Sequence, residues 1–161
     1  MRAFFFATMA AFLSGAVLTS AVHADTLVHH DGWRILQTTM SYEDLVDRLN
    51  KSVKANKMGL VTRASATAGA KAAGITIPGN MIVGVYRNDY ARRMLQASIA
   101  AGIEAPIRYY ITENTDKTAT LSYKTPSAVF APYFEEGGED LKTLASELDA
   151  VFTKIADEAV Q

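Results

Sequence analysis

Arginines gather in one stretch of this chain, residues 81–133, where they could bind an anion. Four of them lie close together in the sequence: Arg87, Arg92, Arg93 and Arg108. Guanidinium groups, and the free backbone N–H groups of a helix that begins near Asn88, both suit a carboxylate, sulfate or phosphate. The alternative is that nearby carboxylates pair with these arginines at the surface, each pair contributing about 0–1 kcal/mol. The candidates for such pairs are Asp89, Glu104 and Glu113.

Tyrosines of the same stretch could line an apolar pocket with polar tips. They are Tyr86, Tyr109, Tyr110, Tyr123 and Tyr133. Tyr109 and Tyr123 share strand faces with branched apolar residues, so we expect them to pack between sheet and helices. Tyr110 shares the opposite face with Arg108 and is the better pocket residue. We therefore predict a binding site for a small anionic or amphipathic molecule, made by Arg87, Arg92, Glu104, Arg108 and Tyr110.

These residues favour a binding or interaction module. An enzyme is the alternative, with Tyr110 or Glu104 as acid and base beside Arg108, and a buried Glu104 would favour it. A purely structural partner protein is a third class, which a large exposed apolar patch on the last helix would indicate.

Metal and cofactor chemistry is not expected. His29 and His30 precede Asp31, but adjacent histidines on an extended chain point apart, and no third ligand follows at a matching spacing. The chain has no cysteine, which excludes thiolate metal sites and thiol catalysis. A glycine-rich phosphate loop, a nucleophile elbow and a zinc-protease helix are also absent from the sequence.

The first residues have the pattern of a secretory signal. Arg2 precedes a mostly apolar run over residues 3–18, and Val-His-Ala at residues 22–24 places small residues where signal peptidase reads them. We expect residues 1–24 to be a signal peptide cleaved after Ala24, with an uncleaved membrane anchor as the alternative. The mature protein is then expected in a bacterial periplasm, without membrane attachment.

The charge balance argues against nucleic-acid binding. The chain carries 16 Lys+Arg and 17 Asp+Glu, a formal net charge of −1, and the loss of Arg2 would make it more negative. No basic surplus is left to bind a phosphate backbone. Without disulfides, an exported chain must be held by its hydrophobic core alone.

The elements that would position the site follow from hydrophobic periodicity. Residues 25–40 are expected to form a leader and a first strand at 33–38, and residues 41–161 the rest of a single α+β domain. Ser41 is expected to cap a helix. Its buried stripe would contain Leu45, Val46, Leu49 and Val53. A second strand at 60–64 and an alanine-rich helix at 67–73 are predicted to follow.

A third strand is predicted at 81–86. Because it is apolar on both faces, we expect both faces to be covered, and Gly84 within it indicates a close approach by a bulky group. Pro78 and Gly79 suit the centre of a type II turn before this strand. After it, a helix capped by Asn88 or Asp89 is predicted to run to about Ala101.

Two alternating runs, residues 107–112 and 118–124, predict an antiparallel hairpin with one apolar face. A long terminal helix after Gly137 and Gly138 would cover that face. Its apolar residues keep helical spacing throughout: Leu141, Leu144, Leu148, Val151, Phe152 and Ile155.

The segments RMLQASIAAGIEAPIRYY (residues 93–110) and ATLSYKTPSAVFAPY (residues 119–133) carry a family resemblance. Over about residues 40–133 the chain resembles the bacterial domain-of-unknown-function 302 family. The resemblance implies an α+β fold akin to the architecture named for the TATA-box-binding protein, a curved antiparallel sheet with a helix packed on it. It also implies a homodimer. The family has no settled activity, so the resemblance implies no reaction.

Overall fold

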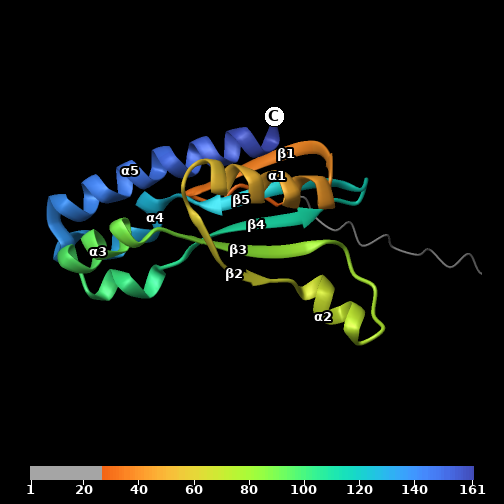
Figure 1. Ribbon diagram of the computed structural model, residues 1–161, viewed down its shortest axis with the longest axis horizontal. Helices are drawn as coiled ribbons and strands as arrows, with labels where there is room; N and C mark the ends of the chain where they lie inside the picture. The colour runs from red at the N-terminus through yellow and green to blue at the C-terminus, as the bar shows by residue number, and fades with distance from the viewer. Residues whose placement is uncertain (1–26) are drawn as a thin grey trace, which may run out of the picture.

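A single antiparallel sheet organises the protein (Figure 1). The computed structural model describes residues 27–161, so the predicted signal peptide lies outside the described residues. Five strands lie in the order β1-β5-β4-β3-β2. Their bounds are β1 (Trp33–Ser41), β2 (Gly59–Ala64), β3 (Asn80–Tyr86), β4 (Ile107–Glu113) and β5 (Thr118–Lys124). The helices are α1 (Tyr42–Ala55), α2 (Ala66–Ala72), α3 (Asn88–Ala97), α4 (Pro126–Phe130) and α5 (Phe134–Val160), with 3-10 turns η1 (Ala100–Glu104) and η2 (Ala131–Tyr133).

Strands β4 and β5 form the predicted hairpin at the centre of the sheet. Tyr109 stands opposite Tyr123, and Ile111 opposite Leu121, and all four side chains are buried. Each strand alternates because successive side chains point to opposite faces. The predicted division of the hairpin into a core face and a second face is therefore confirmed.

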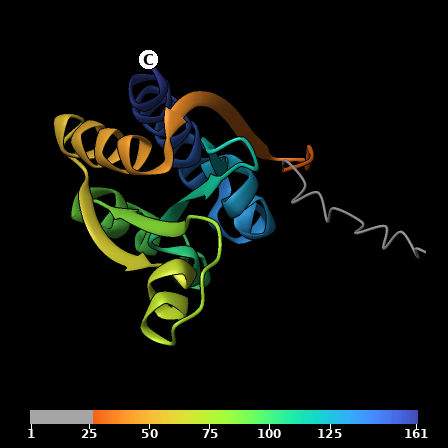
Figure 2. The ribbon, with the colours of Figure 1, turned by 90° about the vertical axis from the view of Figure 1, so that its right-hand side faces the viewer.

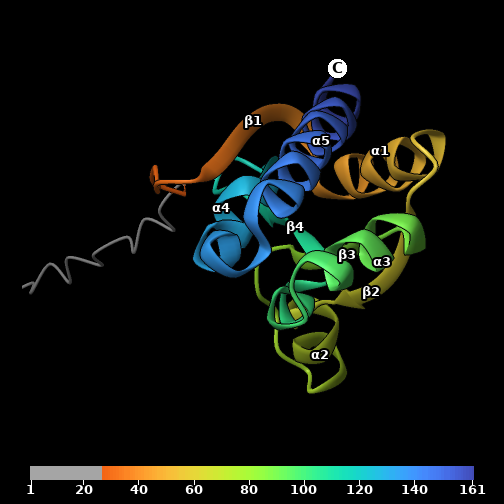
Figure 3. The same ribbon diagram turned by 90° about the vertical axis from the view of Figure 1, so that its left-hand side faces the viewer.

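Helices α1, α3 and α5 form a layer against the core face. Helix α5 contacts α1, α3 and α4, and Figure 3 shows it lying between α1 and α4. Its apolar stripe is buried, with Leu144 1%, Leu148 5% and Phe152 1% exposed, which confirms the predicted cover. The helix is interrupted at Gly138, whose φ of 58° falls in the left-handed region that favours glycine.

Polar contacts tie α1 to the end of α5. Ser41 caps α1 by accepting the Asp44 N–H at 3.1 Å, as predicted. Further along α1, Arg48 Nε donates to the Ala159 carbonyl oxygen at 3.0 Å, and Ser52 Oγ donates to the Ile155 carbonyl oxygen at 2.9 Å. The Ala159 carbonyl lies in the last turn of α5, where carbonyl groups have no partner within the helix, so the bond from Arg48 satisfies it.

Within residues 27–161, the opposite face of the sheet has no such helical layer. The sheet is curved and open, and α2 projects away from the other helices (Figures 1 and 2). The predicted α+β class, with a curved antiparallel sheet and a long terminal helix, is thus the observed one.

Two expectations about strand β3 are wrong. Ile82 is 37% exposed, so the strand is covered on one face only, since its second face belongs to the open side of the sheet. Gly79 does not adopt the positive φ that a type II turn requires at that position. Its N–H instead donates to the Glu113 carboxylate at 2.7 Å, and its carbonyl accepts the Glu113 N–H at 2.8 Å, which continues the strand pairing.

The predicted bounds of α3 also need correction. The helix ends at Ala97, short of Ala101, because Ser98 takes an extended conformation and its Oγ accepts the Ala101 N–H at 3.1 Å to start η1. The N-cap is Arg87, and no side chain caps the helix. Asp89, predicted as a possible cap, binds the Arg87 guanidinium instead.

Candidate functional site

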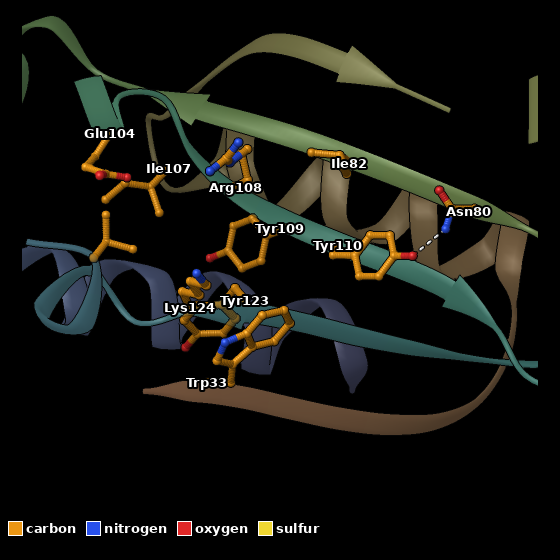
Figure 4. Close-up of a pocket in the computed structure, with 11 residues that line it drawn as sticks. Trp33, Asn80, Ile82, Glu104, Ile107, Arg108, Tyr109, Tyr110, Tyr123 and Lys124 are labelled. Atoms are coloured by element: carbon orange, nitrogen blue, oxygen red, sulfur yellow. Dashed lines mark hydrogen bonds between the residues drawn. The ribbon is translucent and has the colours of Figure 1, made fainter. Parts of the chain in front are cut away.

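The open face of the sheet carries a cavity of about 340 Å³ (Figure 4). Its apolar lining comes mainly from Trp33, Ile82, Ile107 and Val129, which lie on β1, β3, β4 and α4. The polar and charged lining consists of Asn80, Glu104, Arg108, Tyr110 and Lys124. The site therefore combines an apolar wall with a small number of polar groups, as small-molecule sites do.

Strand register places the central side chains. Arg108 and Tyr110 are two residues apart on β4, so they share its open face. Ile82 and Ser122 stand opposite Tyr110 on the two neighbouring strands, and Gly84 stands opposite Arg108. Because Gly84 has no side chain, its position on β3 does not crowd the guanidinium group.

Gly84 fulfils the expectation of a close approach. A Cβ atom at this position would lie 2.8 Å from Cγ of Pro106 and would also overlap Thr62 Oγ1. Glycine lets the neighbouring strand β2 and the proline before β4 come this close.

The charged groups of the cavity differ in whether they have partners. Within residues 27–161, Arg108 takes part in no ion pair and is exposed. The Lys124 ammonium lies 5.8 Å from the centre of the Trp33 ring, within the range of a cation–π contact. Glu104 is half-buried and accepts a hydrogen bond from the Tyr133 hydroxyl at 2.8 Å. This bond to Glu104 raises the pKa of Tyr133.

Tyr110 closes one end of the cavity. Its ring is half-buried and its hydroxyl accepts a hydrogen bond from the Asn80 side-chain amide (Figure 4). Tyr109 and Tyr123 also border the cavity, but their side chains are buried in the core between the sheet and the helices. Their rings pack with Phe152 of α5 at centroid distances of 4.9 and 5.8 Å, as expected of packing residues.

The structure brings together Glu104, Arg108 and Tyr110 of the predicted site, and places Arg87 and Arg92 outside the cavity. Arg87 follows the end of β3, where the chain turns into the helical layer on the other face of the sheet. There it binds Asp89 at 2.7 Å and lies 4.1 Å above the Tyr90 ring, and its guanidinium lowers the pKa of Asp89. Arg92 is exposed on α3.

Arg93, the fourth arginine of the stretch, also lies outside the cavity. It pairs with Glu147 of α5 at 2.6 Å. Arg87 and Arg93 thus form surface ion pairs, which was the alternative to an anion site. Of their two partners, Asp89 was expected and Glu147 was not.

Sequence reasoning missed Trp33, Asn80, Ile82 and Lys124. Trp33 and Lys124 are 91 positions apart and meet because β1 pairs with β5, where these two residues are direct partners. Strand alternation could have placed each on one face of its own strand, but it does not say which strands are neighbours.

Residues 27–161 contain neither a metal-ligand cluster nor a helix able to span a membrane. In that part of the chain, no group of three His, Cys, Asp or Glu side chains could hold a metal ion. His30 packs near the Trp33 ring, with centroids 5.3 Å apart. In the same residues, no helix combines the length and the apolar character needed to cross a bilayer.

The fold and the cavity define a class of protein: an α+β domain with one curved antiparallel sheet, helices on one face and a cavity on the other. The model of the family described as a domain of unknown function, DUF302, matches residues 35–159, and the chain belongs to this family. The crystal structure of an uncharacterised conserved DUF302 protein from Bacillus stearothermophilus is similar, with a TM-score of 0.70 at 16% identity. The match covers 81% of this chain and 99% of that one, and at this identity it shows the fold alone. No curated protein matches.

Proposed function

We propose that this protein binds a small anionic molecule with an apolar body in the cavity on the open face of its sheet. The observation that carries the proposal is the exposed Arg108 guanidinium, which has no carboxylate partner in the described chain and lies in the wall of an apolar cavity.

The charges of the cavity favour an anion. Arg108 offers a planar set of donors that fits a carboxylate, sulfate or phosphate, and Lys124 adds a second cation. The single carboxylate, Glu104, already accepts the Tyr133 hydroxyl. The cavity therefore attracts anions although the whole chain has a net charge of −1.

The apolar lining favours an amphipathic ligand over an inorganic ion. Trp33, Ile82, Ile107 and Val129 would gain contacts from a ring or a short hydrocarbon chain. The volume of about 340 Å³ is at the lower end of the range of about 300–1,000 Å³ for ligand sites.

Binding is favoured over the two other functional classes. An acid-base enzyme would be supported by a buried Glu104, but this residue is half-buried and hydrogen-bonded. A structural partner protein would be supported by exposed apolar residues on the last helix, but the large apolar side chains of α5 are buried or half-buried.

Titration with anilinonaphthalene sulfonate, an aromatic anion whose fluorescence rises in apolar surroundings, tests the proposal. We expect Arg108→Ala to weaken binding about tenfold or more, because hydrogen bonds to charged groups contribute about 1.5–3 kcal/mol. Arg92→Ala is the matched control, since it removes an exposed arginine outside the cavity. Equal affinities of the Arg108→Ala and Arg92→Ala variants would refute the proposed site.

We further propose that the chain is exported to the periplasm, is cleaved after Ala24 and acts as a homodimer without binding nucleic acid. Three aliphatic residues near the end of α3 support an interface: Leu95, Ile99 and Ile103 are 47%, 81% and 80% exposed. Native mass spectrometry of periplasmic protein tests both the cleavage and the subunit count. A monomer, or a mass that retains residues 1–24, would contradict the corresponding part.

A further inference from the structure

A second cavity of about 320 Å³ lies on the same face of the sheet. Its apolar lining includes Leu27, Ala66, Ile77 and Pro78, from the leader, α2 and the loop before β3. It shares two residues, Asn80 and Tyr110, with the first cavity.

The two cavities follow one another along β4. Arg108, Tyr110 and Thr112 share the open face at intervals of two residues, or about 6.4–6.8 Å. Arg108 lines the first cavity, Thr112 the second, and Tyr110 both. Asn80 lies beside this row, because it stands opposite Thr112. The hydrogen bond between the Asn80 amide and the Tyr110 hydroxyl therefore joins the two side chains that border both cavities (Figure 4).

Both side chains that make this hydrogen bond are half-buried, so water can replace either partner when the bond opens. The second cavity contains a carboxylate, but this group already has partners and needs no cation from a ligand. Its carboxylate, Glu113, already accepts the Gly79 N–H at 2.7 Å and pairs with Lys117 at 3.1 Å.

We propose that the Asn80–Tyr110 pair is a gate that sets the length of the ligand. With the pair closed, the first cavity admits a short anion. With it open, the two cavities join, and a long single-chain fatty acid can bind its carboxylate at Arg108 and extend its chain to Ile77 and Pro78. This inference rests on the proposed function of the first cavity.

Competition against anilinonaphthalene sulfonate, with octanoate as the short ligand and palmitate as the long one, tests the gate. Tyr110→Phe and Asn80→Ala each remove the hydrogen bond, from opposite sides. We expect either variant to raise the affinity for palmitate relative to octanoate about fivefold, since only the long ligand requires the hydrogen bond to be broken. The double variant should gain no more than either single one, because both remove the same bond.

Two further variants locate the effect. Tyr86→Phe removes a hydroxyl from a half-buried tyrosine outside both cavities and should change neither affinity. Ile77→Asp places a carboxylate in the second cavity. Combined with Tyr110→Phe, it should abolish the gain for palmitate relative to octanoate, because Ile77 lines only the second cavity.

The outcomes separate the two proposals. If Arg108→Ala weakens the binding of both fatty acids but the gate variants change palmitate and octanoate alike, the gate is refuted and the anion site stands. If Arg108→Ala has no effect on the dye or on either fatty acid, the anion site is refuted and the gate with it.

Discussion

The Tyr109 hydroxyl connects the central strand β4 to the last helix. It donates to the Phe152 carbonyl oxygen at 2.8 Å in the buried core, and the Tyr109 ring stacks on the Phe152 ring at 4.9 Å. Tyr109→Phe removes the hydroxyl and keeps the ring. We therefore expect the free energy of unfolding at neutral pH to fall by about 1–2 kcal/mol, the contribution of one buried hydrogen bond.

The same substitution should change how stability depends on alkaline pH. Burial raises the pKa of Tyr109 well above its ordinary value, because the phenolate would lose its hydration, and nearby Tyr123 adds to the rise. The folded chain thus keeps a proton that the unfolded chain releases above about pH 10. The free energy of unfolding then falls by up to about 1.4 kcal/mol for each further pH unit. Tyr109→Phe removes this contribution, so its stability should fall less steeply above pH 10 than that of the wild type.

Urea denaturation followed by circular dichroism, in a series from about pH 7 to about pH 11, measures both effects. Tyr86→Phe is the control, because Tyr86 lies half-buried at the end of β3 and does not link the sheet to α5. Parallel stability curves for wild type and Tyr109→Phe above pH 10 would refute the assignment of a buried, protonated Tyr109. A neutral-pH loss no larger than that of Tyr86→Phe would refute the stabilising hydrogen bond.

Two further predictions concern packing and surface charge. Gly84→Ala should lower the free energy of unfolding by about 1–3 kcal/mol, because the new Cβ would crowd Pro106 and Thr62; an unchanged urea midpoint would contradict the close packing of β2 on β3. Arg93 lowers the pKa of Glu147, so this pair stabilises the fold above the ordinary glutamate pKa and the effect is lost as the pH falls through the folded value. Both side chains are partly exposed, so a double-mutant cycle on Arg93→Ala and Glu147→Ala should give at most about 1 kcal/mol at neutral pH and less in high salt; a larger coupling that persists in salt would contradict this reading.

Much of the fold could be predicted because its key elements have local signals. The alternation in β4 and β5 placed Tyr109 and Tyr123 on the core face, and the helical spacing of Leu144 and Phe152 predicted the cover on that face. The end of α3 could not be predicted in the same way. The residues after Ala97 are compatible with helix, and it is the capping of η1 by Ser98 that stops α3 there.

The candidate site was predictable only where one strand defined it. Arg108 and Tyr110 were assigned to one face correctly because they are two residues apart on β4. Arg87 and Arg92 were grouped with them because they are near in sequence, yet the chain crosses to the helical layer between β3 and α3. Nearness in sequence does not determine on which face of a sheet a side chain lies after the strand has ended.

The periodic elements, the buried stripe of the last helix and the face that Arg108 and Tyr110 share could be read from the sequence, because these depend on residues a few positions apart. Tertiary structure decided which strands became neighbours. It alone brought Trp33 beside Lys124, set Asn80 against Tyr110 and, in the described part of the chain, left one face of the sheet without a covering helical layer. The physical reason is that pairing between distant segments depends on how the whole core packs, and no local pattern of residues encodes that choice.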